Sequence, residues 1–393
     1  MESGLIRNVY FILSVILLGG AFLYFEPKEQ NSIDFQITLT PTPYKPPYAS
    51  KIDIPMPKGV RSAHAATLTY LENGDLLAAF FAGSREGAKD VKIYGSIYNA
   101  KNHQWNPAFV LLTREELAKK SHQYIKKLGN PVLYRDGKKI YLFVVGTSIG
   151  GWATSKIYQL TMENFSPSKH FVYQGTLQLS PFLNISNLVR SVPIKTNDGG
   201  FYLPIYHELA DKYALILKFN AEGKLDTITK PNHLHRQLQP SLAPLSDITC
   251  LAVFRNHDRY DDVMFSQVCT QNNNGGGGRM DWQKPQMTNV KNHNNSANLI
   301  NFNKNIYLIH NTFERNPKLA RGTLTFSKML SPTEFKKVFI LDETTAPNGE
   351  VSYPTTITDG DNIDIVYTHD RANIRHIRFN QSYLQKQQSG KRQ

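Results

Sequence analysis

The amino-acid sequence predicts an all-β protein, a six-bladed β-propeller preceded by an N-terminal transmembrane helix. Three observations lead to this prediction: an uncharged apolar run near the N-terminus, a hairpin pattern that occurs six times, and a lack of sustained helical periodicity. The chain has 393 residues, of which 40% are hydrophobic, so it can bury a large core and wholesale disorder is excluded. Aromatic residues make up 11% of the chain and favour strands.

The N-terminal segment is expected to lie in a membrane. Residues 9–25 read VYFILSVILLGGAFLYF and carry no charge. The length of this run is near the lower limit for a spanning helix. Arg7 precedes the run and favours a cytoplasmic N-terminus. No small-residue cleavage site follows, so we expect residues 1–25 to be an uncleaved anchor, with a cleaved signal peptide as the alternative. In either case the rest of the chain is expected outside the cytoplasm, in a periplasmic or extracellular space.

Composition divides the rest of the chain into three parts. Residues 26–57 are polar and rich in Pro, which is typical of a linker. Residues 58–380 contain the repeats and are expected to form the propeller. Residues 381–393 form a polar tail.

The repeated unit is an apolar strand, a tight turn of Gly, Asn or Asp, and a second apolar strand. Its copies follow one another at roughly 50 to 60 residues, a period that is typical of propeller blades with four strands each. Six copies closed around an axis give six blades, whereas the alternative is a pair of β-sandwiches with coincidental hairpins. A short polar stretch at 114–127 has helical periodicity. The six hairpins span 67–80, 131–144, 192–206, 241–254, 298–310 and 354–367.

Charge and cysteine content exclude several classes of protein. The net charge of +13 comes from dispersed residues with no run of five or more Lys or Arg, which argues against a nucleic-acid partner. Cys250 and Cys269 are too few for a disulfide scaffold, and whether they pair is left open. The histidines show no metal-ligand spacing, and the glycine-rich stretch 271–278 lacks the Lys-Ser/Thr of a phosphate loop. We therefore expect no metal and no cofactor.

Three segments carry more specific motifs. The first, within 64–90, contains HAAT, NGDLLAAF and GSREGAKD. The second, within 239–255, contains QPSL and a following FR. The third, within 349–376, contains GEVSYP, DG, YT and IRH. With these motifs, residues 58–380 resemble the sialidase-like BNR-repeat proteins, often labelled predicted neuraminidases. The resemblance implies a propeller of the sialidase type and an exo-α-sialidase-like hydrolase with an acidic glycan as its partner. The Asp-box turns of that family are eroded here to remnants at 98–105 and 278–282.

The resemblance also implies site residues. Tyr353 stands where the family has its nucleophile, and Asp90 resembles the acid/base residue. A neutral phenol avoids the repulsion that a carboxylate nucleophile meets at an acidic sugar. Guanidinium groups suit the substrate carboxylate. The candidate substrate-binding residues are Arg85, Glu86, Arg255, Arg315, Arg321, Arg371 and Arg375.

Two positions depart from the family's pattern, and we count both as candidate catalytic residues. His64 stands near the place of the missing first-strand arginine, and Gln239 replaces the expected Glu. Because an amide cannot accept the tyrosine's proton, the standard hydrolytic route is in question. A second hypothesis is a polysaccharide lyase, in which His64 or Tyr353 removes the C5 proton of a uronate and the other protonates the leaving oxygen. A third is a non-catalytic glycan-binding propeller.

Overall fold

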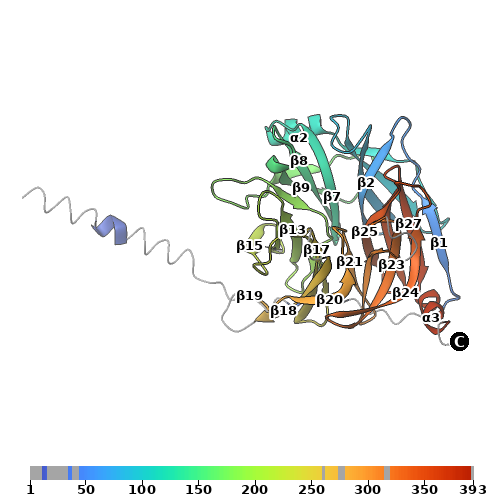
Figure 1. The fold of residues 1–393 in the computed structure, drawn as a ribbon. Coiled ribbons are helices and arrows are strands. Elements are labelled where there is room, and N and C mark those ends of the chain that lie inside the picture. The colour runs from blue at the N-terminus through green and yellow to red at the C-terminus, as the bar shows by residue number, and fades with distance from the viewer. Residues whose placement is uncertain are drawn as a thin grey trace, which may run out of the picture.

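The structure is a computed structural model that describes residues 11–15, 34–37, 44–258, 262–272, 279–313 and 319–390. Within these ranges the strands form six antiparallel sheets, one for each hairpin that the sequence predicts (Figure 1). Neighbouring inner strands contact one another in a series that closes from the last blade back to the first. The six-bladed propeller is therefore confirmed, and the pair of β-sandwiches is excluded.

The first three blades follow one another along the chain. Blade one has β2 (Ser62–Tyr70), β3 (Leu76–Gly83), β4 (Lys92–Asn99), β5 (Gln104–Trp105) and β6 (Phe109–Leu112). After α2 (Arg114–Ser121), blade two has β7 (Lys127–Asp136), β8 (Lys139–Thr147), β9 (Lys156–Glu163) and β10 (Val172–Thr176). Blade three has β11 (Asn187–Val189), β12 (Ile194–Lys195), β13 (Phe201–His207), β14 (Tyr213–Phe219) and β15 (Leu225–Thr229).

The other three blades complete the ring. Blade four has β16 (Gln237–Pro244), β17 (Thr249–Asn256), β18 (Val263–Asn272), β19 (Arg279–Trp282) and β20 (Gln286–Lys291). Blade five has β21 (Asn298–Phe302), β22 (Asn305–Thr312), β23 (Thr323–Ser331) and β24 (Glu334–Glu343). Blade six has β25 (Val351–Thr358), β26 (Asn362–His369), β27 (Asn373–Asn380) and, from the start of the chain, β1 (Ala49–Asp53).

The core lies between the blades. β3 and the central part of β8 are buried on both faces, which explains why these strands are continuous apolar runs in the sequence. Each blade packs its apolar side chains against those of the next blade, and these contacts form a series of hydrophobic clusters around the ring.

Both ends of the described chain are more ordered than their composition indicates. β1 lies inside the predicted linker, yet it pairs with β27 and covers the edge of blade six. Its alternate residues are exposed, so it lacks the apolar run of an inner strand. Phe35 is buried and forms a bridge with Thr196 of blade three. The predicted polar tail contains the helix α3 (Gln381–Ser389), which packs Leu384 into the cluster of blades five and six.

The predicted membrane anchor lies largely outside the described residues. Of the run 9–25 the structure describes residues 11–15, which are helical. In the part of the chain that the structure describes, no helix has the length and apolar character needed to cross a membrane.

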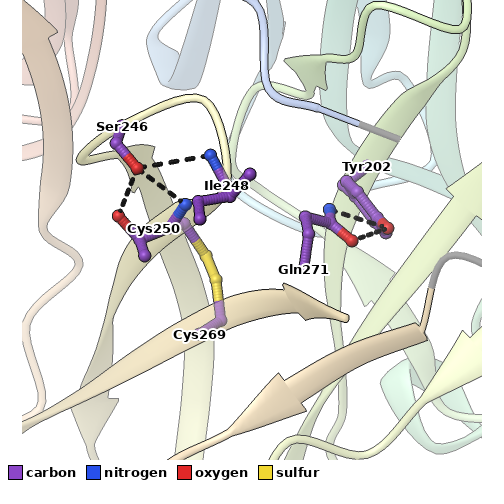
Figure 2. The surroundings of a disulfide bond; sticks show 7 residues. Tyr202, Ser246, Ile248, Cys250, Cys269 and Gln271 are labelled. Atoms are coloured by element: carbon purple, nitrogen blue, oxygen red, sulfur yellow. Dashed lines mark hydrogen bonds between the residues drawn. A yellow bond between two sulfur atoms is a disulfide. The ribbon is translucent and has the colours of Figure 1, made fainter. Parts of the chain in front are cut away.

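The two cysteines form a disulfide bond, which resolves the question that the sequence left open. Cys250 on β17 and Cys269 on β18 are direct partners in the antiparallel register, and their Cα atoms lie 5.0 Å apart. Both side chains are buried, and Figure 2 shows the bond between their sulfur atoms. The bond therefore connects two adjacent strands of blade four within the core.

Candidate functional site

Three inner strands carry a β-bulge near the end where the candidate residues lie. Ala65 on β2, Gln239 on β16 and Tyr353 on β25 have φ values of 52°, 44° and 56°, in the left-handed region that non-glycine residues seldom adopt. The strand register shifts at each of these residues. Bulges redirect side chains and are frequent beside active sites. Here they occur in the strands of three blades that carry predicted site residues.

Tyr353 lies at the centre of a cluster of side chains. The cluster consists of Tyr353, His64, Glu86, Arg190, Arg255, Arg321, Glu350 and Arg371. Its hydroxyl accepts a hydrogen bond of 3.0 Å from Nη1 of Arg255. The guanidinium carbons of Arg190, Arg255 and Arg321 lie 5.4 to 5.7 Å from the centroid of its ring. Burial raises the pKa of Tyr353, but the positive charges of Arg255 and Arg321 and the hydrogen bond from Arg255 outweigh burial. The net effect is a pKa below that of an ordinary tyrosine.

Two predicted arginines are held beside Tyr353 by a pair of asparagines. Nε of Arg255 donates to Oδ1 of Asn294 at 2.7 Å, and Nε of Arg321 donates to Oδ1 of Asn295 at 3.0 Å. Nη2 of Arg321 also donates to the backbone oxygen of Asn294 at 3.1 Å. The turn between β20 and β21 therefore fixes both guanidinium groups next to the phenol.

A chain of ion pairs extends the cluster towards blade one. Glu350 accepts from Nη1 of Arg321 and pairs with Nε of Arg371, both at 3.3 Å. Nη1 of Arg371 in turn donates to Glu86 at 2.6 Å. The structure thus brings the candidate residues Glu86 and Arg371 together with the cluster. Glu350 was not among the predicted site residues, although it stands in the GEVSYP motif.

His64 lies against the ring of Tyr353. The two ring centroids are 4.3 Å apart in an edge-on arrangement, and Nδ1 of His64 lies 3.8 Å from a carboxylate oxygen of Glu350. His64 is 2% exposed, and neither ring nitrogen has a hydrogen-bond partner among the described residues. Burial and the nearby arginines, Arg371 first among them, hold the pKa of His64 well below its usual value. The imidazole is therefore neutral at pH 7.

Gln239 is buried beside the same group of residues. Its amide nitrogen donates to the hydroxyl of Tyr206 at 3.3 Å, and its amide oxygen has no partner among the described residues. Burial raises the pKa of Tyr206, so this phenol stays neutral. Gln239 thus presents a neutral amide where the family pattern implies a carboxylate.

Asp90 and Arg85 belong to the loop that follows β3. Both are exposed, and the carboxylate of Asp90 accepts hydrogen bonds from the backbone and the hydroxyl of Ser84 at 2.9 and 2.8 Å. The hydrogen bond from the Ser84 hydroxyl lowers the pKa of Asp90. Glu86, in the same loop, reaches Arg371, so this loop borders the cluster.

The structure does not bring Arg375 to the cluster. Arg375 lies on β27, where its Nε donates to Asp53 of β1 at 2.6 Å and its Nη1 donates to Asp342 of β24 at 2.9 Å. Both partners belong to outer strands, so Arg375 links the edges of blades five and six and lies apart from the other predicted substrate-binding residues. Arg315 lies outside the described residues.

One arginine of the cluster was not predicted at all. Arg190 follows β11 in blade three and is 2% exposed. In the sequence it is an isolated charge after a short apolar run, which gives no signal of a site.

No metal-binding group accompanies these residues. Across the described ranges, no three His, Cys, Asp or Glu side chains are grouped so that they could hold a metal ion.

The fold and the cluster define a six-bladed propeller with a group of arginines around Tyr353. The chain belongs to the family described as BNR repeat-like domain, which matches residues 74–365. No curated protein sequence matches the chain significantly.

Solved structures show the same fold at low sequence identity. A sialidase of Trypanosoma rangeli is 12% identical, with a TM-score of 0.65 over 88% of this chain and 61% of its own. A protein of unknown function from Dyadobacter fermentans is 10% identical, with a TM-score of 0.63 over 84% and 97%. The NanB sialidase of Streptococcus pneumoniae is 10% identical, with a TM-score of 0.56 over 82% and 69%. The chain thus spans about three fifths of the trypanosomal enzyme.

Proposed function

We propose that this protein is a glycoside hydrolase that acts on a sugar carrying a carboxylate, in the manner of an exo-α-sialidase. The observation that carries the proposal is the Tyr353 hydroxyl, bonded to Arg255 and flanked by Arg321 in a largely buried cluster. Such a site attracts an anion and favours the phenolate. The fold of the trypanosomal sialidase, which is known in complex with sialic acid, supports this class of substrate.

Each residue of the cluster has a distinct part in the proposed reaction. Arg255 and Arg321, with Arg371 as the third guanidinium, bind the carboxylate. The phenol of Tyr353 first gives its proton to solvent water; the phenolate oxygen then attacks the anomeric carbon, and the bond to the leaving oxygen breaks as that oxygen takes a proton from Asp90. Water then attacks the anomeric carbon and gives its proton to Asp90, and the bond to the Tyr353 oxygen breaks, which releases the sugar and restores the phenolate. The positive charge beside the phenol favours the phenolate, and this takes the role of the carboxylate base that is missing because residue 239 is Gln.

A fluorogenic aryl sialoside tests this proposal with the full chain. Tyr353→Phe keeps the ring contacts and removes the nucleophile, so sialic acid release is expected to fall to the background rate. Tyr134→Phe is the matched control, because it removes the hydroxyl of a different buried tyrosine. Unlike that of Tyr353, this hydroxyl has no partner among the described residues. Wild-type turnover by Tyr353→Phe, or loss of turnover in both variants alike, contradicts the assignment.

A lyase is the second candidate, and the neutral, unpartnered His64 beside Tyr353 favours it. A neutral imidazole can accept the C5 proton of a uronate whose carboxylate is held by arginines. The product is an unsaturated uronate that absorbs in the ultraviolet, and His64→Ala is expected to abolish it. Sialic acid release without this absorbance decides against the lyase. A non-catalytic glycan-binding propeller gives neither product, yet its affinity for an acidic glycan falls in Arg255→Ala.

We also propose that the propeller is exported and anchored by the apolar run 9–25. The run itself, and the disulfide between Cys250 and Cys269, which is typical of oxidising compartments, support this placement. Membrane fractionation followed by protease treatment of intact cells tests it. Recovery of the full chain in the soluble cytoplasmic fraction contradicts the proposal.

A further inference from the structure

Arg190 connects three blades beneath Tyr353. Its Nη1 donates to the backbone oxygen of Ala66 on β2 at 3.2 Å and to the hydroxyl of Thr355 on β25 at 2.7 Å. Its Nη2 donates to the backbone oxygen of Tyr353. A side chain from blade three thus reaches both blade one and blade six.

The two backbone carbonyls that Arg190 binds belong to residues that the β-bulges leave without a partner in the strand register. The register of β2 shifts around Ala66, and the register of β25 shifts around Tyr353, so neither residue has a partner in its ladder. A buried carbonyl without a partner is costly. The fork of Arg190 satisfies both carbonyls, and the Thr355 hydroxyl adds a bond of 2.7 Å to the oxygen of Ala66. The bulged segments next to His64 and at Tyr353 are therefore fixed relative to each other.

We propose that Arg190 is a positioning residue, which holds the backbone of Tyr353 so that its hydroxyl meets Arg255. This inference rests on the proposed function, which makes that hydroxyl the reacting group. Arg190 is 2% exposed, and its two terminal nitrogens are bound to protein groups, so it acts through Tyr353 and does not bind the substrate. Lysine cannot replace it, because an ammonium lacks the planar fork that spans two carbonyls.

The titration of Tyr353 reports its position without any need for turnover. When the phenol moves away from Arg255, it loses a charge-assisted hydrogen bond, and its pKa rises towards the ordinary value. Arg190→Lys keeps the positive charge at residue 190 and removes the planar fork. The variant therefore separates the effect of the position of Tyr353 from the effect of the charge at residue 190. Among the described residues, the charged or titratable groups around the phenol are His64 of β2, Glu86 of the loop after β3, Arg190, Tyr206 of β13, Arg255 of β17, Arg321, Glu350 and Arg371.

The experiment measures kcat, KM and the ultraviolet titration of Tyr353, with the spectrum of Tyr353→Phe as the reference. In Arg190→Lys we expect kcat to fall about 10²-fold with KM nearly unchanged, as for a misplaced reacting group, and the pKa of Tyr353 to rise. Wild-type kcat and an unshifted pKa in a folded variant overturn the proposal. If the wild type shows no turnover while the pKa still shifts, the proposed function fails and the positioning role stands.

A matched pair of threonines covers the case in which Arg190→Lys does not fold. Thr355 and Thr356 are both buried on β25, but only the Thr355 hydroxyl joins Arg190 to Ala66, whereas that of Thr356 has no partner among the described residues. Thr355→Val is expected to shift the Tyr353 titration and lower kcat in the same directions as Arg190→Lys. Thr356→Val is expected to leave both unchanged. Equal behaviour of the two variants overturns the positioning role.

Discussion

Replacing Asp364 with Asn tests the junction that closes the ring between blades six and one. The carboxylate is fully buried on β26 and accepts two hydrogen bonds from Arg378, at 3.0 and 2.9 Å, and one from His376 at 2.8 Å. Tyr70 of β2 donates to it across the junction at 2.7 Å. Trp105 of β5 donates to the other nitrogen of His376 at 3.2 Å. One carboxylate thus organises polar contacts between the two blades that carry His64 and Tyr353.

The expected magnitude follows from the charge that Asp364→Asn leaves behind. The substitution keeps the shape of the side chain but deprives the buried Arg378 of its closest counter-ion. Breaking a buried ion pair from one side costs about 3–5 kcal/mol. For a large domain this corresponds to roughly 2 °C per kcal/mol, so the Tm is expected to fall by about 6–10 °C.

The pH dependence of this loss has a defined sign. Burial raises the pKa of Asp364, but the hydrogen bond from His376, the charge of Arg378 and the hydrogen bond from Tyr70 outweigh burial and bring it below the usual value. A carboxylate whose pKa is lower in the folded state contributes stability above its unfolded pKa of about 3.9 and loses it as the pH falls through the folded pKa. The difference in Tm between wild type and variant is therefore complete at neutral pH and shrinks in acid.

Thermal unfolding at pH 7 and at acidic pH measures the effect, with Asp359→Asn as the control. Asp359 bonds the same Arg378 at 3.5 Å, but its side chain is 34% exposed, so its pair is worth at most about 1 kcal/mol. Equal losses in the two variants, or a loss in Asp364→Asn that grows as the pH falls, refute the reasoning.

Three further perturbations test other parts of the molecule. Replacing both Cys250 and Cys269 with Ala opens a bond with a sequence separation of 19 residues and is expected to cost roughly 3 kcal/mol in urea unfolding, with no loss in a reducing buffer. Ser84→Ala removes the hydrogen bond that lowers the pKa of Asp90, so the alkaline limb of the pH–rate profile is expected to move to higher pH; an unmoved limb contradicts Asp90 as the acid. Deleting the chain through β1 is expected to lower the Tm, because β27 becomes an uncovered edge; an unchanged Tm contradicts a stabilising role for β1.

The blades could be predicted because their signals are local. Each hairpin combines two apolar strands with a turn of Gly, Asn or Asp, and these signals lie within about fifteen residues of one another. β1 and α3 could not be predicted in this way. β1 is a half-exposed strand whose partner, β27, lies at the other end of the chain, so nothing in its own residues indicates the pairing.

The site residues also divide into those with a local signal in the sequence and those without one. Tyr353 and Arg255 stand in motifs, and the structure places them together with the predicted Arg321. Arg190 has no local signal, because its partners on two other blades meet it only after the ring has closed. Arg375 is a candidate substrate-binding residue from its motif alone, but it bonds to carboxylates of two outer strands. A motif thus indicates candidate site residues, whereas the closure of the ring determines which of them come into contact.

The net charge of +13 gains a specific meaning only at this cluster. Among its described residues are four guanidinium groups, those of Arg190, Arg255, Arg321 and Arg371, and two carboxylates, those of Glu86 and Glu350, which leaves an excess of positive charge around the rings of Tyr353 and His64. The same excess that attracts a carboxylate also lowers the pKa of Tyr353 and, in addition to burial, lowers the pKa of His64. Anion affinity and phenol acidity therefore have one electrostatic origin, and Arg255→Met is expected to reduce both together. A variant that loses affinity for the acidic sugar while the titration of Tyr353 is unchanged contradicts this common origin.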